Sequence, residues 1–480
     1  MKNRTALQNV GLALGLFAVA LALVLPAPAG MDTAAWRTAA VTVLMAVWWA
    51  TEALPLAATA LAPLVLLTPL GVSPFDKVTA PYANETIFLI LGGFLLGVAM
   101  QRWNLHKRIA YAIVLRAGAR PRALVLGVMC ATAFVSLWTS NTSTTLMMLP
   151  VALSIAAVLA PPGESLDRDQ RNFATALILS VAYAASIGGL GTLIGTPTNA
   201  LVAGFMRQNF AVDVSFTDWL VFGMPTVLLL LPVTWLVLTR VSFPFELSSG
   251  LEAHRAVRAA YAELGPMSRA ERRVAMVFVL TGAAWIARGL LEGVPAIAGV
   301  GDATIGVLAG LTLFILPAGS ADGALLRGED MMRVPWDVLL LFGGGLSLAA
   351  AIQGSGLSAF IGTQLSGLGG LPLPLLTLAV VLLLVFWTEL NSNVAAAATF
   401  MPIVAALATA STHPVLALVA PTAMAASAGF MMPVGTPPNA IVYGTGRVTM
   451  REMMRAGILV DILAVVAIAL VAWLTLPWMG

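Results

Sequence analysis

Long apolar runs separated by short polar segments follow one another along the whole chain. A helix of about 20 apolar residues is long enough to cross a bilayer. The pattern predicts eleven such helices, near residues 9–27, 36–50, 54–70, 84–101, 177–206, 218–239, 274–291, 302–317, 336–352, 419–444 and 457–478. We therefore expect an all-α polytopic membrane protein.

Two further apolar stretches, at about 123–159 and 373–410, are interrupted near the middle by the pairs Ser140-Asn141 and Ser392-Asn393. Each is interpreted as a re-entrant hairpin. The predicted helices at 177–206 and 419–444 are themselves interrupted by Gly-Thr-Pro, beginning at Gly195 and Gly435. Because backbone at membrane depth is left unpaired only where it lines a site or a cavity, these four interruptions predict binding sites.

The basic residues support this topology. With the N-terminus in the cytoplasm and both hairpins re-entrant, 21 of the 25 Lys and Arg residues lie on the cytoplasmic side, as short loops require. The four exceptions are Arg37, Lys77, Arg207 and Arg288. A hairpin that crossed fully would move the basic loops after it to the outside. The charge pattern therefore predicts a cytoplasmic N-terminus and an external C-terminus.

The interruptions belong to an internal repeat. At an offset of 252 residues the first hairpin aligns with the second, pairing Ser136 with Thr388, Ser140 with Ser392, Asn141 with Asn393, Thr142 with Val394 and Pro150 with Pro402. An odd number of crossings between the copies makes the repeat inverted, as in secondary transporters. We expect an N-terminal transmembrane helix at 1–35, retained and not cleaved as a signal peptide, a first repeat at 36–245, a cytoplasmic connector at 246–273 and a second repeat at 274–480.

Composition narrows the function classes. Hydrophobic residues make up 59% of the chain and charged residues 10%, against about 25% charged in a soluble domain, so we expect no sizeable extramembrane domain and no nucleic-acid partner. The single cysteine, Cys130, excludes an internal disulfide. The apolar spans contain no nucleophile with a base and no His and carboxylate metal set, so we expect no enzyme and no organic cofactor. The intramembrane carboxylates Glu52 and Glu389 are interpreted mainly as structural, with Glu389 bracing the second hairpin.

Several motifs in order resemble those of the divalent-anion:sodium symporter family. They are the paired Ser-Asn motifs, the stretch WWATEALP at 48–55 and the stretch SAGFMMPVGTPPNAIVYGTG at 427–446. The resemblance covers nearly the entire chain. It implies an elevator-type homodimer in the lipid of a bacterial inner membrane, with a fixed scaffold domain and a mobile transport domain. The transport domain would carry Na⁺ with a dicarboxylate, a tricarboxylate or sulfate.

The resemblance also implies the site residues. The first Na⁺ site would use Ser136, Ser140, Asn141 and Gly195, and the second Thr388, Asn391, Asn393 and Gly435. Gly195, Asn391 and Gly435 would contribute backbone carbonyls. The substrate site would use Asn141, Thr142, Pro197, Asn393, Val394, Thr436 and Pro437. Neutral oxygen ligands suit weak and reversible Na⁺ binding.

No Lys or Arg lies beside these motifs, although an anion usually recruits one. We expect the bound Na⁺ ions and the N-termini of the half-helices to supply the positive potential, which would couple the two substrates. Val394 replaces the hydroxyl of Thr142 in the second copy, and a methyl-lined wall favours C4-dicarboxylates or citrate. A Na⁺-independent dicarboxylate exchanger and a sulfate:Na⁺ symporter stay open as alternatives.

Overall fold

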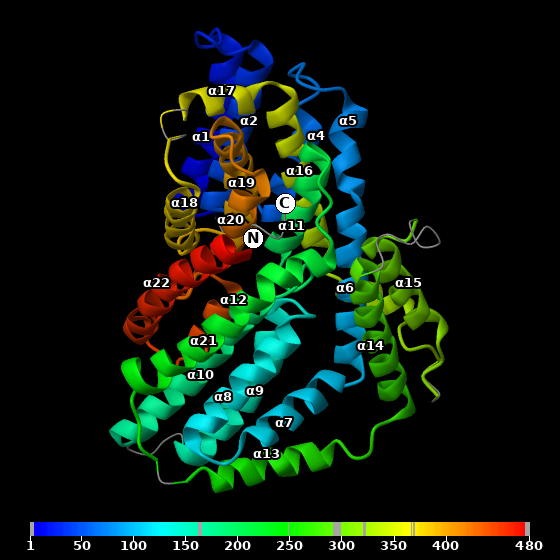
Figure 1. The fold of residues 1–480 in the computed structure, drawn as a ribbon, viewed down its shortest axis with the longest axis vertical. Helices are drawn as coiled ribbons and strands as arrows, with labels where there is room; N and C mark the ends of the chain where they lie inside the picture. Colours follow the sequence, from blue (N-terminus) through cyan, green and yellow to red (C-terminus); the bar gives the residue numbers. More distant parts are fainter. Residues whose placement is uncertain are drawn as a thin grey trace.

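A computed structural model describes residues 4–475 except 162–165, 248, 291–298, 320–322, 366, 368 and 369. Within these residues the chain is helical, and its β-structure is limited to one isolated bridge between Pro317 and Ala324 (Figure 1). Parts of three predicted segments, residues 1–3, 291 and 476–480, lie outside the described residues.

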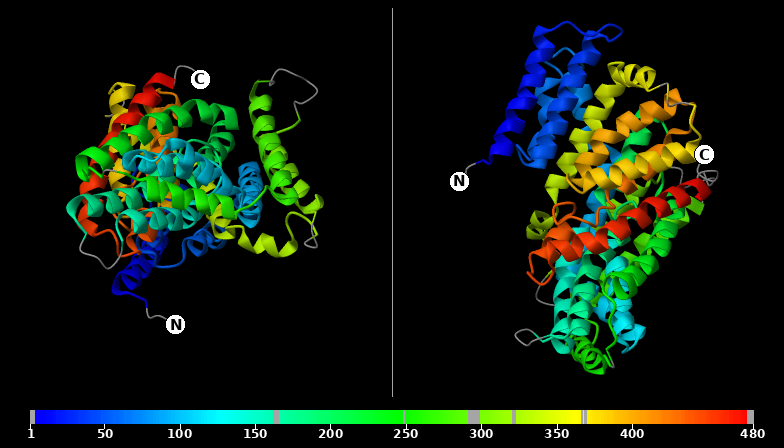
Figure 2. Two further views of the ribbon diagram at one scale, coloured as in Figure 1. Left: turned by 90° about the horizontal axis from the view of Figure 1, so that it is seen from below. Right: turned by 90° about the vertical axis from the view of Figure 1, so that its left-hand side faces the viewer.

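The first half of the chain contains α1 (Ala6–Val24), α2 (Thr33–Thr51), α3 (Leu56–Thr59), α4 (Ala62–Leu66), α5 (Phe75–Thr79), α6 (Glu85–Arg102), α7 (Leu105–Ala117), α8 (Pro121–Ser136), α9 (Asn141–Leu159), α10 (Arg168–Gly189), α11 (Pro197–Phe210) and α12 (Phe216–Leu236). The second half contains α13 (Leu251–Glu263), α14 (Arg269–Leu290), α15 (Asp302–Ile315), α16 (Trp336–Gly354), α17 (Leu357–Gln364), α18 (Leu373–Thr388), α19 (Asn393–Ala410), α20 (Val415–Ala426), α21 (Pro437–Tyr443) and α22 (Met450–Thr475). Two helix pairs are peripheral: α1 packs on α2, and α14 and α15 stand to one side of the bundle (Figure 2).

The predicted hairpins are α8 with α9 and α18 with α19, each joined by a four-residue turn. The predicted broken helices are α10 with α11 and α20 with α21. These broken helices form the centre of the molecule, because every residue of 173–189 in α10 and of 416–426 in α20 is buried. The hairpins pack directly against them, α8 and α9 on α10 and α18 and α19 on α20.

A glycine makes the first break compact. A side chain at Gly195 would come within 2.6 Å of the Gly189 carbonyl oxygen and 3.0 Å of the Ser136 carbonyl oxygen. Only glycine permits this approach between the break and the hairpin turn. Pro197 then begins α11, where its missing N–H costs nothing.

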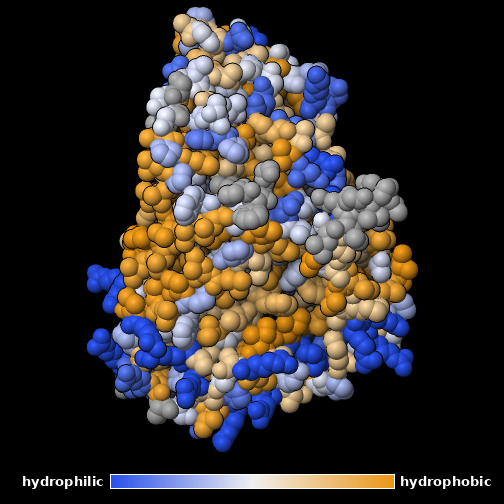
Figure 3. All heavy atoms as spheres, viewed as in Figure 1, coloured by the Kyte–Doolittle hydropathy of each residue, from blue (hydrophilic) through white to orange (hydrophobic). Residues whose placement is uncertain are grey.

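The outer surface is that of a membrane protein. Apolar side chains cover the middle of the view in Figure 3, and hydrophilic side chains gather at its lower end. Highly exposed apolar side chains lie on several helices, among them Val24, Leu228, Val279, Ile315 and Trp473. Within the described residues, eight helices are long and apolar enough to cross a membrane, and five apolar helices are shorter.

The structure departs from the predicted spans in two ways. Residues 54–70 form two short helices, because Pro63 has no N–H to continue α3 past Thr59. The helices α7, α13 and α17 lie outside the predicted spans, and α13 occupies the predicted connector. The basic residues of α6 and α7 also bind partners within the chain: Arg102 pairs with Asp330 and Arg108 with Glu271.

Candidate ion and substrate site

A cavity of about 970 Å³ lies where the two hairpin turns meet the two helix breaks. All seven predicted substrate residues line it: Asn141, Thr142, Pro197, Asn393, Val394, Thr436 and Pro437. Its exposed wall residues include Glu52, Arg333 and Asp337, so the cavity opens on their side. Two motifs about 250 residues apart in sequence are thus brought to one chamber.

Behind the first hairpin turn lies a group of oxygen atoms, here called the first oxygen cluster: Ser136 Oγ, the Asn141 amide and the Ala185 and Gly195 carbonyls. Ser136 Oγ donates to the Ala185 carbonyl at 2.7 Å and contacts the Asn141 amide at 2.9 Å. The amide lies 3.1 Å from the Ala185 carbonyl and 3.3 Å from the Gly195 carbonyl. Ser136 is fully buried.

The second hairpin repeats this arrangement in the second oxygen cluster: Thr388 Oγ1, the Asn393 amide and the Ala426 and Gly435 carbonyls. Thr388 Oγ1 donates to the Ala426 carbonyl at 2.7 Å and contacts the Asn393 amide at 2.9 Å. The amide lies 3.2 Å from the Ala426 carbonyl and 3.0 Å from the Gly435 carbonyl. Hairpin residues correspond at an offset of 252 and residues around the breaks at 240 or 241.

Each asparagine amide can turn either terminal atom to its cluster. With the nitrogen inward, the amides of Asn141 and Asn393 donate to the hydroxyl and both carbonyls. With the oxygen inward, four oxygens face one another, which is favourable only with a cation between them. Oxygen-only sets of this kind suit a hard cation such as Na⁺.

Two residues predicted as ligands, Ser140 and Asn391, form local hydrogen bonds with their side chains, and Asn391 is predicted to bind through its backbone carbonyl. Ser140 Oγ binds Ser143 Oγ at 2.9 Å and accepts from the Ser143 N–H at 3.3 Å, which caps α9. Asn391 Oδ1 accepts from the Ser392 N–H at 2.9 Å. The clusters also contain the carbonyls of Ala185 and Ala426, which no side-chain motif could indicate.

Two further asparagines, absent from the predicted site, hold the breaks open. Asn199 Nδ2 donates to the carbonyls of Gly189, Leu190 and Thr192 at 2.9, 3.3 and 2.8 Å. Asn439 Nδ2 donates to the carbonyls of Gly429 and Met432 at 3.3 and 3.0 Å. Their signal in the sequence is the shared fifth position of GTPTN and GTPPN.

Four helices begin at the cavity wall: α9, α11, α19 and α21. Helix N-termini present unpaired N–H groups and a partial positive charge. Neither Thr196 before α11 nor Ser392 before α19 caps its helix with a side-chain hydrogen bond. The first-turn N–H groups of α19 are therefore available to a ligand, whereas in α11 Pro197 has no N–H and the Asn199 N–H bonds the Thr196 carbonyl at 3.2 Å. Among the described wall residues Arg333 is the one basic side chain, and 59% of it is exposed. The positive potential inside the cavity therefore comes mainly from backbone N–H groups.

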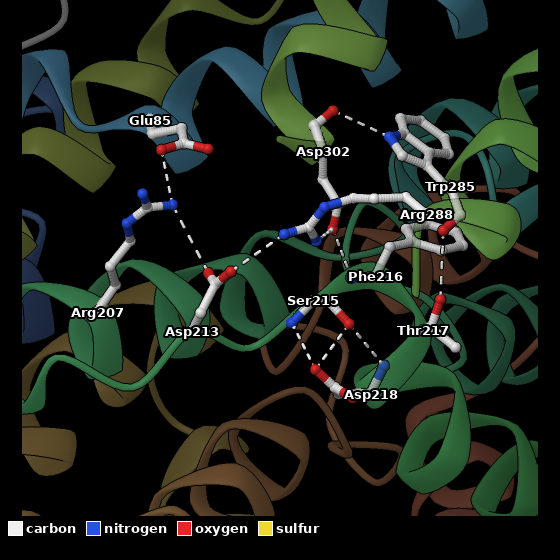
Figure 4. Close-up of polar contacts among 10 residues, drawn as sticks. All are labelled: Glu85, Arg207, Asp213, Ser215, Phe216, Thr217, Asp218, Trp285, Arg288 and Asp302. Atoms are coloured by element: carbon white, nitrogen blue, oxygen red, sulfur yellow. Dashed lines mark hydrogen bonds and ion pairs between the residues drawn. The ribbon is translucent and has the colours of Figure 1, made fainter. Parts of the chain in front are cut away.

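A second, small pocket of about 20 Å³ lies beside a chain of ion pairs (Figure 4). Arg207 pairs with Glu85 at 2.6 Å and with Asp213 at 3.6 Å. Arg288 pairs with Asp213 at 3.3 Å and with Asp302 at 3.2 Å. Asp302 also accepts from the N–H of Phe216 at 2.7 Å. These contacts join α6, α11, α12, α14 and α15, so the cluster is structural. Arg207 and Arg288 of this cluster are two of the four basic residues that the charge pattern predicts on the outer side.

Comparison with known proteins agrees with this geometry. Residues 6–479 match the family described as "Sodium:sulfate symporter transmembrane region". The chain is 39% identical over 476 residues to the sodium-dependent dicarboxylate transporter SdcS of Staphylococcus saprophyticus, covering 98% of this chain and 92% of the relative. It is also 39% identical over 490 residues to SdcS of Staphylococcus aureus strain USA300, covering 99% and 92%.

Two solved transporters share the fold at low sequence identity. The YdaH transporter of Alcanivorax borkumensis superposes with a TM-score of 0.57 at 15% identity, covering 99% of each chain. MtrF of Neisseria gonorrhoeae superposes with a TM-score of 0.58 at 13% identity, covering 98% of this chain and 95% of its own. With its matched family, its relatives and its apolar helices, this chain belongs to the divalent-anion:sodium symporter family and is an integral membrane transporter, not an enzyme.

Proposed function

We propose that this protein imports C4-dicarboxylates such as succinate, malate and fumarate, or citrate, by symport with Na⁺. The observation that supports this most is the meeting of two oxygen clusters and four helix N-termini at one cavity. The relatives at 39% identity are named sodium-dependent dicarboxylate transporters, which points to the same cargo.

One Na⁺ would bind in each oxygen cluster. In the first, Ser136, Asn141 and Gly195 would be ligands together with Ala185, and Ser140 could add its carbonyl. In the second, Thr388, Asn393 and Gly435 would act with Ala426, and Asn391 could add its carbonyl. Each asparagine would turn its amide oxygen inward when the ion arrives and its nitrogen inward when the ion leaves.

The dicarboxylate would bind in the cavity between the clusters. Asn141, Thr142, Asn393 and Thr436 would supply hydrogen bonds, Pro197 and Pro437 would shape the helix starts, and Val394 would contact the carbon backbone. Without Na⁺ the anion would lose much of its compensating charge, and two Na⁺ without the anion would be costly to move through a low-dielectric region. This reciprocity would couple the two fluxes.

The structure suits alternating access in an inward-open state. The cavity opens beside Arg333 and Asp337, on the side that the basic residues predict to be cytoplasmic. We infer an elevator movement of the hairpins and broken helices against a scaffold of the other helices. We also infer a homodimer in the lipid of the bacterial inner membrane, with the N-terminus inside and the C-terminus outside.

Reconstituted protein tests the proposal. Uptake of labelled succinate into proteoliposomes should require an inward Na⁺ gradient and should fall when choline replaces Na⁺. Unlabelled citrate and sulfate as competitors would rank the anions. Uptake that does not depend on Na⁺ and requires dicarboxylate inside the vesicles would indicate an exchanger and overturn the proposal. If sulfate is the one competitor that inhibits uptake, sulfate would replace dicarboxylate as the proposed cargo.

A further inference from the structure

Two carboxylates lie deep in the second repeat, directly behind its hairpin turn. Glu389, the residue after Thr388, accepts from the N–H groups of Met431 and Met432 at 2.8 and 2.6 Å. Asp461, on α22, accepts from the N–H of Phe430 at 3.0 Å. Because three successive amides of the second break bind these two side chains, the carboxylates are neighbours.

These carboxylates are withdrawn from water. Glu389 is 1% exposed and Asp461 is fully buried. Within the described residues neither forms an ion pair with a basic side chain, and Asp461 Oδ2 is a buried atom with no hydrogen-bond partner. Two neighbouring negative charges in a low-dielectric interior are unfavourable, so either one carboxyl holds a proton or a cation lies between the two.

The first repeat has apolar side chains at the same two places. Leu137 corresponds to Glu389 at the hairpin offset. Gly223 of α12 packs against the backbone of the first break, and Gly457 of α22 packs against the second break in the same way. Four residues after these glycines, α12 has Val227 and α22 has Asp461. The side chains of Leu137 and Val227 both lie beside Gly191. Gly191 corresponds to Met431 in the second repeat. The first repeat therefore fills these two positions without charged side chains. Packing alone does not explain why the second repeat has two carboxylates there.

We propose that the carboxylates of Glu389 and Asp461 bind one additional Na⁺, separate from the two oxygen clusters. This proposal rests on the proposed function and deepens it. A carboxylate oxygen has two lone pairs, so the Glu389 oxygens can each accept one N–H and still coordinate an ion. Asp461 Oδ2 supplies a further oxygen with no competing donor. Carboxylate oxygens are ligands that a hard cation prefers.

In the part of the chain that the structure describes, no basic side chain lies within ion-pair distance of Glu389 or Asp461. Tyr183 on α10 is fully buried near the pair, and its hydroxyl binds the Met453 carbonyl at 3.2 Å. Arg451 and Arg455 lie on α22 toward its start and are exposed, beside Met431 at the surface. The three backbone N–H groups can balance part of one negative charge, and the bound Na⁺ would balance the other.

The additional ion changes the charge moved in each cycle. Two Na⁺ with a dianion are electrically neutral, whereas three Na⁺ carry one net positive charge inward. An inside-negative potential of about 100 mV would then raise the equilibrium accumulation of succinate by roughly 50-fold. Transport by only two ions would not respond to the potential in this way.

The test compares the wild type with Glu389→Gln/Asp461→Asn, which keeps side-chain size and removes both charges. Succinate accumulation is measured in proteoliposomes at a fixed Na⁺ gradient, with and without a K⁺ diffusion potential set by valinomycin. We expect the wild type to respond to the potential and the variant to keep Na⁺-dependent uptake but lose the response, with one Na⁺ fewer per succinate by ²²Na⁺ flux. Asp76→Asn, at an exposed carboxylate of α5, is the matched control and should behave as the wild type.

Binding gives a second measurement that needs no transport. NaCl should raise the melting temperature of the purified protein, and the rise should be smaller in the double variant, because each bound ion adds its own stabilisation. The variant Glu389→Leu/Asp461→Val, which has the side chains of the first repeat, should show the same smaller rise in melting temperature. It replaces Glu389→Gln/Asp461→Asn in the test if that variant does not fold. An unchanged ²²Na⁺ count, or a potential response that follows a pH gradient in place of Na⁺, would overturn the proposal. Wild-type protein with no Na⁺-dependent uptake would instead refute the proposed function.

Discussion

The two repeats build the same oxygen cluster from different residues and support it in different ways. In both, a hydroxyl, an asparagine amide and two carbonyls meet behind a hairpin turn. The hydroxyl comes from Ser136 in one copy and Thr388 in the other, so the atom is kept and the residue type is not. The comparison teaches that the two repeats share the arrangement of these oxygen atoms more closely than they share residue types.

The supports diverge around this shared arrangement. In the first repeat Thr192 Oγ1 donates to the Leu137 carbonyl at 2.5 Å, which ties the break to the hairpin turn. Met432 occupies the corresponding place in the second repeat and has no hydroxyl. There the Glu389 side chain makes the tie by accepting the Met431 and Met432 N–H groups. A neutral link in one copy is thus replaced by a charged one in the other.

The largest expected effect comes from removing the element that both copies share. Asn141→Ala and Asn393→Ala should each reduce Na⁺-driven succinate uptake to roughly 1% or less, because each loses a charge-assisted contact worth about 1.5–3 kcal/mol to the ion and another to the anion. Uptake is measured in proteoliposomes over a range of Na⁺ concentrations. Asn209→Ala, which removes a contact to the Phe205 carbonyl away from the cavity, is the matched control. Near-normal uptake by either cluster variant would remove that cluster from the proposed site.

A smaller effect should separate the two breaks. Asn199→Ala removes hydrogen bonds to three carbonyls and Asn439→Ala to two. The carbonyls of Leu190, Thr192 and Met432 keep a second donor, so each variant leaves one buried carbonyl, of Gly189 or of Gly429, unpaired at a cost of about 1–3 kcal/mol, and Asn199→Ala loses one hydrogen bond more. We therefore expect both variants to melt at a lower temperature in detergent, and Asn199→Ala to melt lowest. Melting is compared without Na⁺ so that ion binding does not contribute. Equal losses would show that the two breaks are held with equal strength despite their contacts.

The sequence predicted the parts of this architecture that depend on residue type. Apolar runs located the helices, and Gly-Thr-Pro within them located both breaks, because these residues cannot continue a buried helix. The Ser-Asn motifs located the hairpin turns. The carbonyls of Ala185 and Ala426 could not be found in this way, since a backbone ligand leaves no mark on residue type.

Other features were missed because their signal is weak or distant. The helices α7 and α13 are amphipathic and short, so a hydropathy pattern does not distinguish them from polar loops. Asp461 lies 72 residues beyond Glu389 in the chain, and only the fold brings the two carboxylates to the same three amides. Glu389 alone was correctly interpreted as a brace of its hairpin.

The smallest expected effect concerns the one cavity position where the repeats differ in a hydroxyl. Thr142 and Val394 are the second residues of α9 and α19, and both line the cavity. Val394→Thr adds a donor of nearly the same size, so the inhibition constant of sulfate should fall relative to that of succinate by about 3- to 10-fold, the worth of one hydrogen bond of 0.5–1.5 kcal/mol. Thr142→Val should move the ratio the other way, and the double exchange should return it toward the wild-type value if the two positions face one anion. Competition against labelled succinate measures all four proteins, and a ratio that stays constant across them would assign anion selection to the helix N-termini, whose N–H groups are common to both repeats.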